Sequence, residues 1–277
     1  IDESGINAGF YERATAPEIC DYFNRVLEDH VASGRVRFMA LSDYRDEDGD
    51  GHHVVSLLTG AETTVRVRRR FVDATYTESS IPSRHTPSFV VDEGVRLVPP
   101  NDLVDLQDTP SGFTIIGAGK TAMDTCNWLL DEGVDHGRIR WIRPRDGWLL
   151  NRAFFQPLAE VGSYMQLQAR WVEAAANATT GSEFAHHMEA NDVLVRIDRD
   201  REPEVFRGPT ISIAELDALR QIGDVVRLGR VLRVGRDKVT LADGTIASDP
   251  GQVYVDCTAA GVPPTQPSLG TLIRVGN

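Results

Sequence analysis

The feature that most constrains this chain is a run of strand, turn, helix and strand signals between residues 113 and 146. Residues 113–116 form a continuous apolar stretch, as a buried parallel strand does. The small residues Gly117, Gly119 and Ala122 come next, and they lead into a helical pattern over residues 120–133. A second apolar strand is expected over residues 138–142. This order of elements predicts an α/β fold built around a parallel sheet.

The turn has the pattern G-x-G-x-x-A, and each small residue in it has a physical reason. Gly117 allows a tight turn, Gly119 lets a pyrophosphate approach the backbone, and Ala122 lets the helix pack closely on the strand. The positive end of the helix then faces the phosphates. In this context the pattern predicts a dinucleotide site, and a connection without a ligand is the alternative. The candidate residues are Gly117, Ala118, Gly119, Lys120, Thr121 and Ala122.

The tip of the second strand favours NADP(H) over NAD(H). An NAD site usually has an acidic residue about 20 residues beyond the glycines, where it binds the ribose hydroxyls, whereas an NADP site tends to have arginine. The sequence here is Arg143-Pro144-Arg145-Asp146. Arg143 and Arg145 are therefore candidates for binding a 2′-phosphate, and Asp146 keeps the NAD interpretation open. Solvated side chains are the alternative for both arginines and for Lys120.

The charge balance limits which partners the chain can have. Acidic residues outnumber basic ones 41 to 29, which gives a formal charge of −12. Because a field of that sign repels phosphate backbones and anionic headgroups, we expect neither nucleic acid nor a membrane as a partner. The cysteines at positions 20, 126 and 257 form no C-x-x-C pair, so we expect a cytoplasmic protein without a metal site. A small-molecule substrate is the expected partner, and a homo-oligomer is one option for the assembly.

The rest of the chain alternates helix and strand signals. Thr15 and Glu18 form a capping box that opens a helix, and apolar residues such as Ile19 and Phe23 predict one buried face for it. Ser212 and Glu215 form a second box, which opens a helix as far as residue 222. A loop is expected after Asp146. Further helices are predicted over residues 156–179 and 183–191. Strands are predicted over residues 35–44, 53–58, 63–70, 71–75, 225–228, 230–234, 238–241 and 253–256, with a hairpin turn at residues 59–62.

Two longer stretches carry a family resemblance. The first is Phe-Thr-Ile-Ile-Gly-Ala-Gly-Lys-Thr-Ala-Met-Asp-Thr-Cys, and the second is Arg-Ile-Arg-Trp-Ile-Arg-Pro-Arg-Asp-Gly-Trp-Leu-Leu-Asn-Arg, both within residues 113–152. They resemble the pyridine-nucleotide domain of FAD/NAD(P)-dependent oxidoreductases, and most closely that of flavin-containing monooxygenase-like proteins. More loosely, residues 35–75 resemble the middle of that family's FAD domain. Residues 255–259 resemble the strand on which its inserted NADP domain returns to the FAD domain.

The resemblance implies a Rossmann-type three-layer NAD(P)-binding domain inserted into a partial FAD-type domain with a β-meander. The chain also departs from the family pattern, because no G-x-G-x-x-G turn precedes the first helix and the signature F-x-G-x-H-x-x-x-W is absent. We therefore expect an interior portion of a longer flavoprotein, which would bind FAD as a whole. The expected parts are a partial FAD-type domain over residues 1–105, an NADP(H)-binding domain over residues 106–262 and a return segment over residues 263–277.

The function implied by the resemblance is that of a flavin-dependent, monooxygenase-like oxidoreductase that uses NADPH to reduce FAD. In such proteins the cofactors carry the chemistry, and the sequence singles out no catalytic side chain. Two other hypotheses stay open at this point. One is an NADP(H)-binding sensor or regulatory module without turnover, and the other is an NAD-dependent dehydrogenase without flavin.

Overall fold

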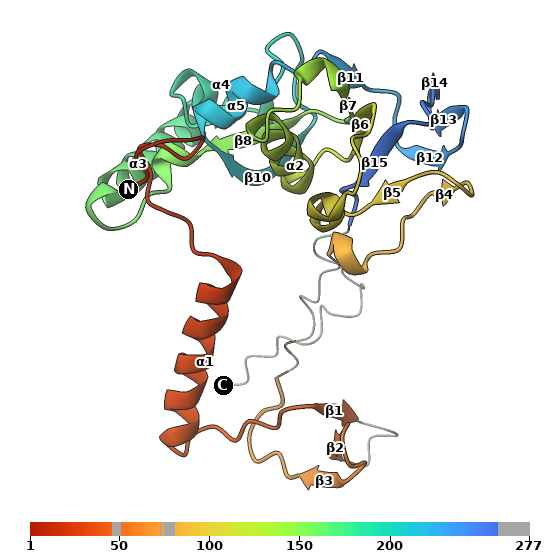
Figure 1. The fold of residues 1–277 in the computed structure, drawn as a ribbon. Helices are drawn as coiled ribbons and strands as arrows, with labels where there is room; N and C mark the ends of the chain where they lie inside the picture. Colours follow the sequence, from red (N-terminus) through yellow and green to blue (C-terminus); the bar gives the residue numbers. More distant parts are fainter. Residues whose placement is uncertain (46–50, 73, 75–80, 260–277) are drawn as a thin grey trace. The chain divides into compact units, whose positions relative to one another are not determined.

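The computed structural model describes residues 1–45, 51–72, 74 and 81–259 (Figure 1). Its contacts divide the chain into two compact units, of which the smaller comprises Arg13–Thr77 and the larger comprises Ile1–Glu12 together with Glu78–Asn277. The fold is mixed α/β, with parallel, antiparallel and mixed sheets. No helix among the described residues is both long and apolar enough to cross a membrane.

A five-stranded parallel sheet forms the centre of the larger unit. Its order is β11 (Asp224–Val226), β7 (Ile139–Ile142), β6 (Gly112–Ile116), β15 (Gln252–Asp256) and β5 (Leu97–Val98). The strand β6 is buried at every position and β15 at four of its five positions. Strands covered on both faces need apolar side chains on both faces, which explains why most of their residues are apolar.

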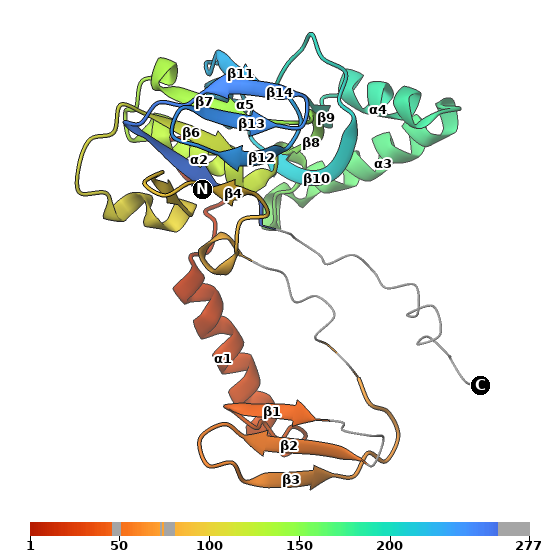
Figure 2. The same cartoon turned by 90° about the vertical axis from the view of Figure 1, so that its right-hand side faces the viewer.

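Two different layers cover the faces of this sheet. On one face lie the helices α2 (Lys120–Asp131) and α5 (Ile213–Leu219) (Figure 1). Their apolar side chains cluster with Ile115, Trp141 and Val255 of the sheet. On the other face lies a four-stranded sheet (Figure 2), whose residues cluster with Ile116 and Tyr254. The order of that sheet is β14 (Gly244–Ala247), β13 (Lys238–Leu241), β12 (Val231–Val234) and β4 (Val90–Val91).

A separate sheet begins with the strand that follows β7 in the chain. The strands β10 (Val205–Ile211), β8 (Gly147–Asn151) and β9 (Leu194–Val195) form a mixed sheet. It shares an apolar cluster with the helices α3 (Val161–Asn177) and α4 (Gly181–Ala190). The short 3-10 turns of the larger unit are η2 (Pro82–Arg84), η3 (Pro100–Asp105), η4 (His136–Arg138), η5 (Arg152–Phe154) and η6 (Leu158–Glu160).

The smaller unit consists of one helix and a three-stranded antiparallel sheet. The helix α1 (Ala16–Ala32) begins with the predicted capping box of Thr15 and Glu18. The strands β1 (Ser42–Arg45), β2 (His52–Ser56) and β3 (Glu62–Val65) pair in sequence order, and the predicted hairpin between β2 and β3 is confirmed. The predicted buried face of α1 is wrong, because the helix has no buried residue.

Several predicted boundaries also differ from the structure. Strand β1 covers only the end of the stretch predicted over residues 35–44, and α3 begins at Val161 rather than at residue 156. The loop predicted after Asp146 is the strand β8. Of the strand predicted over residues 71–75, residues 71, 72 and 74 form no strand, and residues 73 and 75 lie outside the described residues. The segment 263–277 also lies outside them.

Candidate functional site

The glycine turn lies at the carboxyl edge of the parallel sheet, where β6 and β15 end side by side. The Gly117 amide donates to the Ile142 carbonyl (3.0 Å), and the Cys257 amide donates to the Ile116 carbonyl (2.9 Å). Gly117 has φ +141°, and a Cβ atom placed on it would lie 2.9 Å from the Cys257 carbonyl oxygen. The fold therefore requires glycine at position 117, both for its backbone angle and for the approach of the two chain segments.

Gly119 is different, because the protein itself does not require glycine there. It is the N-cap of α2 with φ −92°, and a Cβ atom on it would meet nothing within 4 Å. No side chain caps α2, whereas Thr15, Thr180 and Ser212 accept hydrogen bonds from the first turns of α1, α4 and α5. The first amides of α2 have no acceptor within the helix, so their hydrogen-bonding capacity is open to a ligand.

A cavity of about 880 Å³ opens at this edge of the sheet. It extends from the residues that follow β7, across the glycine turn, to the residues that follow β15. Its volume is within the range of cofactor sites, roughly 300–1,000 Å³. In open α/β sheets, ligands usually bind in a crevice outside the carboxyl ends of the parallel strands.

The structure brings most of the sequence candidates to the cavity wall. Gly117, Ala118, Gly119, Lys120, Thr121 and Arg145 line it. Ala122 is fully buried in the cluster between α2 and the sheet, in agreement with a packing role. Arg143 does not line the cavity and is only 2% exposed.

Arg143 is held in a chain of charges behind the strand tip. Its guanidinium lies 2.7 Å from the Asp146 carboxylate and 4.7 Å from the centre of the Trp141 ring. Two nitrogens of the guanidinium have no hydrogen-bond partner among the described residues. Asp146 also binds Arg227 (2.8 Å), which reaches Asp198 (2.7 Å). Burial lowers the pKa of Arg143, and the nearby Asp146 counteracts part of that effect. Asp146 is therefore occupied by two arginines rather than exposed as a ribose acceptor.

Two arginines on the cavity wall are free of such partners. The side chains of Arg145 and Arg230 make no hydrogen bond or ion pair with any residue that the structure describes. Arg145 follows β7, and Arg230 follows β11, which runs parallel to β7 with Val226 opposite Ile142. Because parallel neighbours end at the same edge of a sheet, both arginines leave the sheet on the side of β7 and β11. Arg230 was not predicted from the sequence, since it lies 85 positions after Arg145 and no local pattern marks it.

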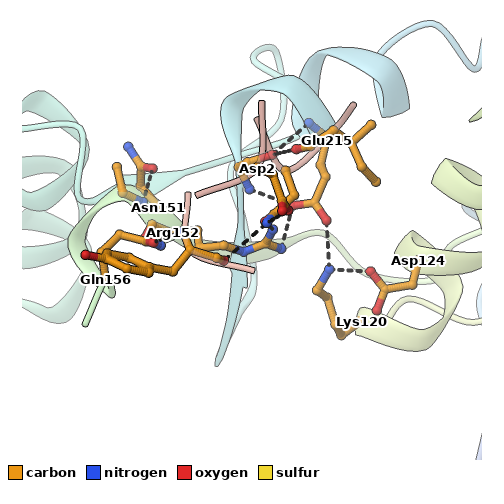
Figure 3. A network of polar contacts seen from close by, with 12 residues as sticks. Asp2, Lys120, Asp124, Asn151, Arg152, Gln156 and Glu215 are labelled. Atoms are coloured by element: carbon orange, nitrogen blue, oxygen red, sulfur yellow. Dashed lines mark hydrogen bonds and ion pairs between the residues drawn. The ribbon is translucent and has the colours of Figure 1, made fainter. Parts of the chain in front are cut away.

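Lys120 lines the cavity, but two carboxylates already bind its ammonium (Figure 3). One is Asp124 of the same helix, and the other is Glu215, whose Oε1 lies 3.5 Å from the Lys120 Nζ. Glu215 is fully buried and also pairs with Arg152 at 2.6 Å. The four charges cancel, so Lys120 adds no net positive charge to the cavity.

The same network holds the first residues of the chain (Figure 3). Glu215 completes the capping box of α5 with Ser212, and the Ser212 hydroxyl donates to the Ile6 carbonyl (3.0 Å). Arg152 donates to the Asn7 side chain (3.1 Å). The start of α2, the start of α5 and the N-terminal segment of the larger unit are thus joined through one buried carboxylate.

Cys257 lines the cavity but is unsuited to thiol chemistry. Burial raises the pKa of its thiol to about 12, although the Thr125 hydroxyl lies 3.6 Å from its sulfur. The nucleophilic form of a cysteine is the thiolate, so this side chain stays in its unreactive form near neutral pH.

Comparison with known proteins gives relatives without a stated function. The chain is 39% identical over 265 residues to uncharacterized proteins of Mycobacterium bovis and of two strains of Mycobacterium tuberculosis. The alignment covers 95% of this chain and 48% of each of those proteins, so the chain spans about half the length of the curated relatives it matches. No family model matches the chain.

Among solved structures, L-lysine 6-monooxygenase from Pseudomonas syringae shows a distant similarity. The match covers 94% of this chain and 62% of that chain, with a TM-score of 0.35 and 11% identity.

Proposed function

We propose that the cavity binds NADP(H), with the pyrophosphate at the start of α2 and the 2′-phosphate at Arg145 and Arg230. The observation that carries the proposal is that no side chain caps the start of α2, where Gly119 leaves open space at the cavity wall. The same cavity is lined by the two guanidiniums without partners, those of Arg145 and Arg230. A chain with a net charge of −12 must hold phosphates with local groups, and backbone amides and arginines are the groups best suited to do so.

In this proposal the residues of the motif have separate tasks. Gly117 through Thr121 form the phosphate cradle, Ala122 packs α2 on the sheet, and Arg143 fixes the strand tip from which Arg145 extends. A Rossmann-type domain over residues 106–262 is the corresponding domain proposal.

We extend the proposal to a flavin-dependent, monooxygenase-like oxidoreductase for a protein of the relatives' full length. NADPH supplies a hydride to flavin in such enzymes, and the residues of this chain would bind and orient the dinucleotide. The described residues ahead of α1 contain no second glycine turn, so we assign no residue of this chain to FAD. The support for flavin is the sequence resemblance of residues 113–152.

The dinucleotide proposal is tested by calorimetric titration of the 277-residue chain with NADPH and NADH. We expect Arg145→Ala and Arg230→Ala each to weaken NADPH binding at least about tenfold, since a hydrogen bond to a charged group contributes roughly 1.5–3 kcal/mol. NADH binding should change far less, because NADH lacks the 2′-phosphate. Arg199→Ala, which removes an exposed arginine outside this cavity, is the matched control. Equal losses for both nucleotides would contradict the 2′-phosphate assignment, and no binding of either nucleotide would contradict the site.

The flavin extension needs a separate experiment on the full-length protein. A yellow protein that NADPH bleaches under anaerobic conditions is the expected result. A colourless protein that still binds NADPH would support the sensor alternative instead.

A further inference from the structure

A second cluster of polar side chains lies behind the cavity wall at the carboxyl end of β15. The amide and the hydroxyl of Thr258 both donate to Asp256 Oδ1, at 2.9 Å and 2.6 Å. His85 Nε2 lies 3.9 Å from Asp256 Oδ2 and 3.5 Å from the Thr258 hydroxyl. Asp256 is only 5% exposed, and no lysine or arginine of the described residues pairs with it. It is a buried carboxylate whose ion-pairing neighbour is a histidine, which is charged only when protonated.

The order of the strands places this cluster relative to a bound dinucleotide, and this step rests on the proposed function. Across the sheet edge, β11 and β7 carry Arg230 and Arg145, β6 carries the glycine turn, and β15 carries Thr258. With the 2′-phosphate at the arginines and the pyrophosphate at the glycine turn, the nicotinamide half extends toward β15. Thr258 lines the cavity there, and Asp256 lies directly behind it.

The two oxidation states of the dinucleotide differ in charge at this end. The nicotinamide ring of NADP⁺ is cationic, and the dihydronicotinamide ring of NADPH is neutral. A buried carboxylate attracts the cation more strongly than one in water would, because the effective dielectric constant is lower. We propose that Asp256 makes this cavity selective for NADP⁺ over NADPH.

The other charges at the cavity do not produce the same selectivity. Arg145 and Arg230 meet phosphates that both oxidation states share. The charges of Lys120 and Arg152 are cancelled by those of Asp124 and Glu215. Asp256 acts through its field rather than by contact, since Thr258 and not Asp256 lines the cavity. It is therefore a specificity-determining residue and not a catalytic one.

The test compares the dissociation constants of NADP⁺ and NADPH, measured by calorimetry on the 277-residue chain. The wild-type chain should bind NADP⁺ more tightly than NADPH. Asp256→Asn keeps an acceptor for Thr258 and removes the charge, so the preference should fall about five- to tenfold, mainly through weaker binding of NADP⁺. Asp237→Asn is the matched control, because it removes the same charge from an exposed turn between β12 and β13 that does not line the cavity.

The wild-type measurement keeps the proposal falsifiable even if Asp256→Asn does not fold. Equal binding of the two forms by the wild-type chain, or tighter binding of NADPH, would overturn the proposal. A preference that Asp256→Asn leaves unchanged would do the same. Failure of the wild-type chain to bind either nucleotide would instead overturn the proposed dinucleotide site.

Discussion

At the scale of single residues, the most consequential side chain outside the cavity is Glu215. Burial by itself would raise the pKa of this carboxyl, but the hydrogen bond from the Ser212 amide, the pairing with Arg152 and the charge of Lys120 together lower it below its ordinary value of 4.5. A group whose pKa is lower in the folded state stabilises the fold above its unfolded pKa. That contribution is lost as the pH falls through the lowered value.

Glu215→Gln should therefore destabilise the larger unit in a pH-dependent manner. At neutral pH we expect a loss of about 3 kcal/mol in the free energy of unfolding, because Arg152 remains buried without its counter-ion. The difference from the wild type should shrink in acid below pH 4.5, as the wild-type carboxylate itself becomes protonated. Urea unfolding at neutral and acid pH measures both effects.

The matched control for Glu215 is Glu173→Gln, on the exposed surface of α3. That side chain has no partner among the described residues, so its loss should change the stability little at either pH. A Glu215→Gln variant that behaves like this control would show that the buried network contributes nothing to folding.

At the scale of elements, local signals predict where a helix or strand begins better than they predict what it contacts. The capping boxes at Thr15 and Ser212 and the glycine turn before α2 are encoded within four to six neighbouring residues, and the structure has α1, α5 and α2 at these places. The strand β8 escaped prediction because its partners β9 and β10 follow more than 40 positions later in the chain.

The candidate site shows the same limit. The sequence indicates two arginines at the tip of β7, but it does not indicate which of them is buried. Arg143 contacts Trp141 and Asp146, and Arg227 in turn binds Asp146, whereas Arg145 lies on the cavity wall. Arg230 reaches the site only because β11 pairs with β7.

The two glycines of the turn give a prediction at this scale, since one serves the fold and the other serves the ligand. Gly117→Ala should lower the free energy of unfolding by at least about 2 kcal/mol, because of its backbone angle and its contact with the Cys257 carbonyl. Gly119→Ala should cost less than about 1 kcal/mol, since its Cβ atom meets only open space. It should nevertheless abolish NADPH binding, because the methyl group occupies the path of the pyrophosphate.

Thermal unfolding and calorimetric titration of both variants separate these effects. NADPH binding by Gly119→Ala at wild-type affinity would remove the phosphate cradle from the proposed site. A Gly117→Ala variant as stable as the wild type would show that the turn relaxes without cost.

At the scale of the whole molecule, the two units differ in what can stabilise them. The larger unit contains three apolar clusters around its sheets. In the smaller unit no residue among 13–45, 51–72 and 74 is buried, and Phe23 of α1 is 62% exposed. An amphipathic pattern such as that of α1 shows which face would be buried, but it does not supply the partner that covers it.

Hydrogen exchange on the 277-residue chain should reveal this difference directly. Amides of α2 are protected by the core of the larger unit and should open only with it, whereas α1 has a capping box but no buried side chain to hold it. We expect the amides of α1 to exchange at least about 100-fold faster than those of α2, because local stability follows the number of buried apolar contacts. Mass spectrometry of peptides from both helices in one sample makes α2 the internal reference. Equal protection of the two helices would show that another part of the molecule covers the apolar face of α1.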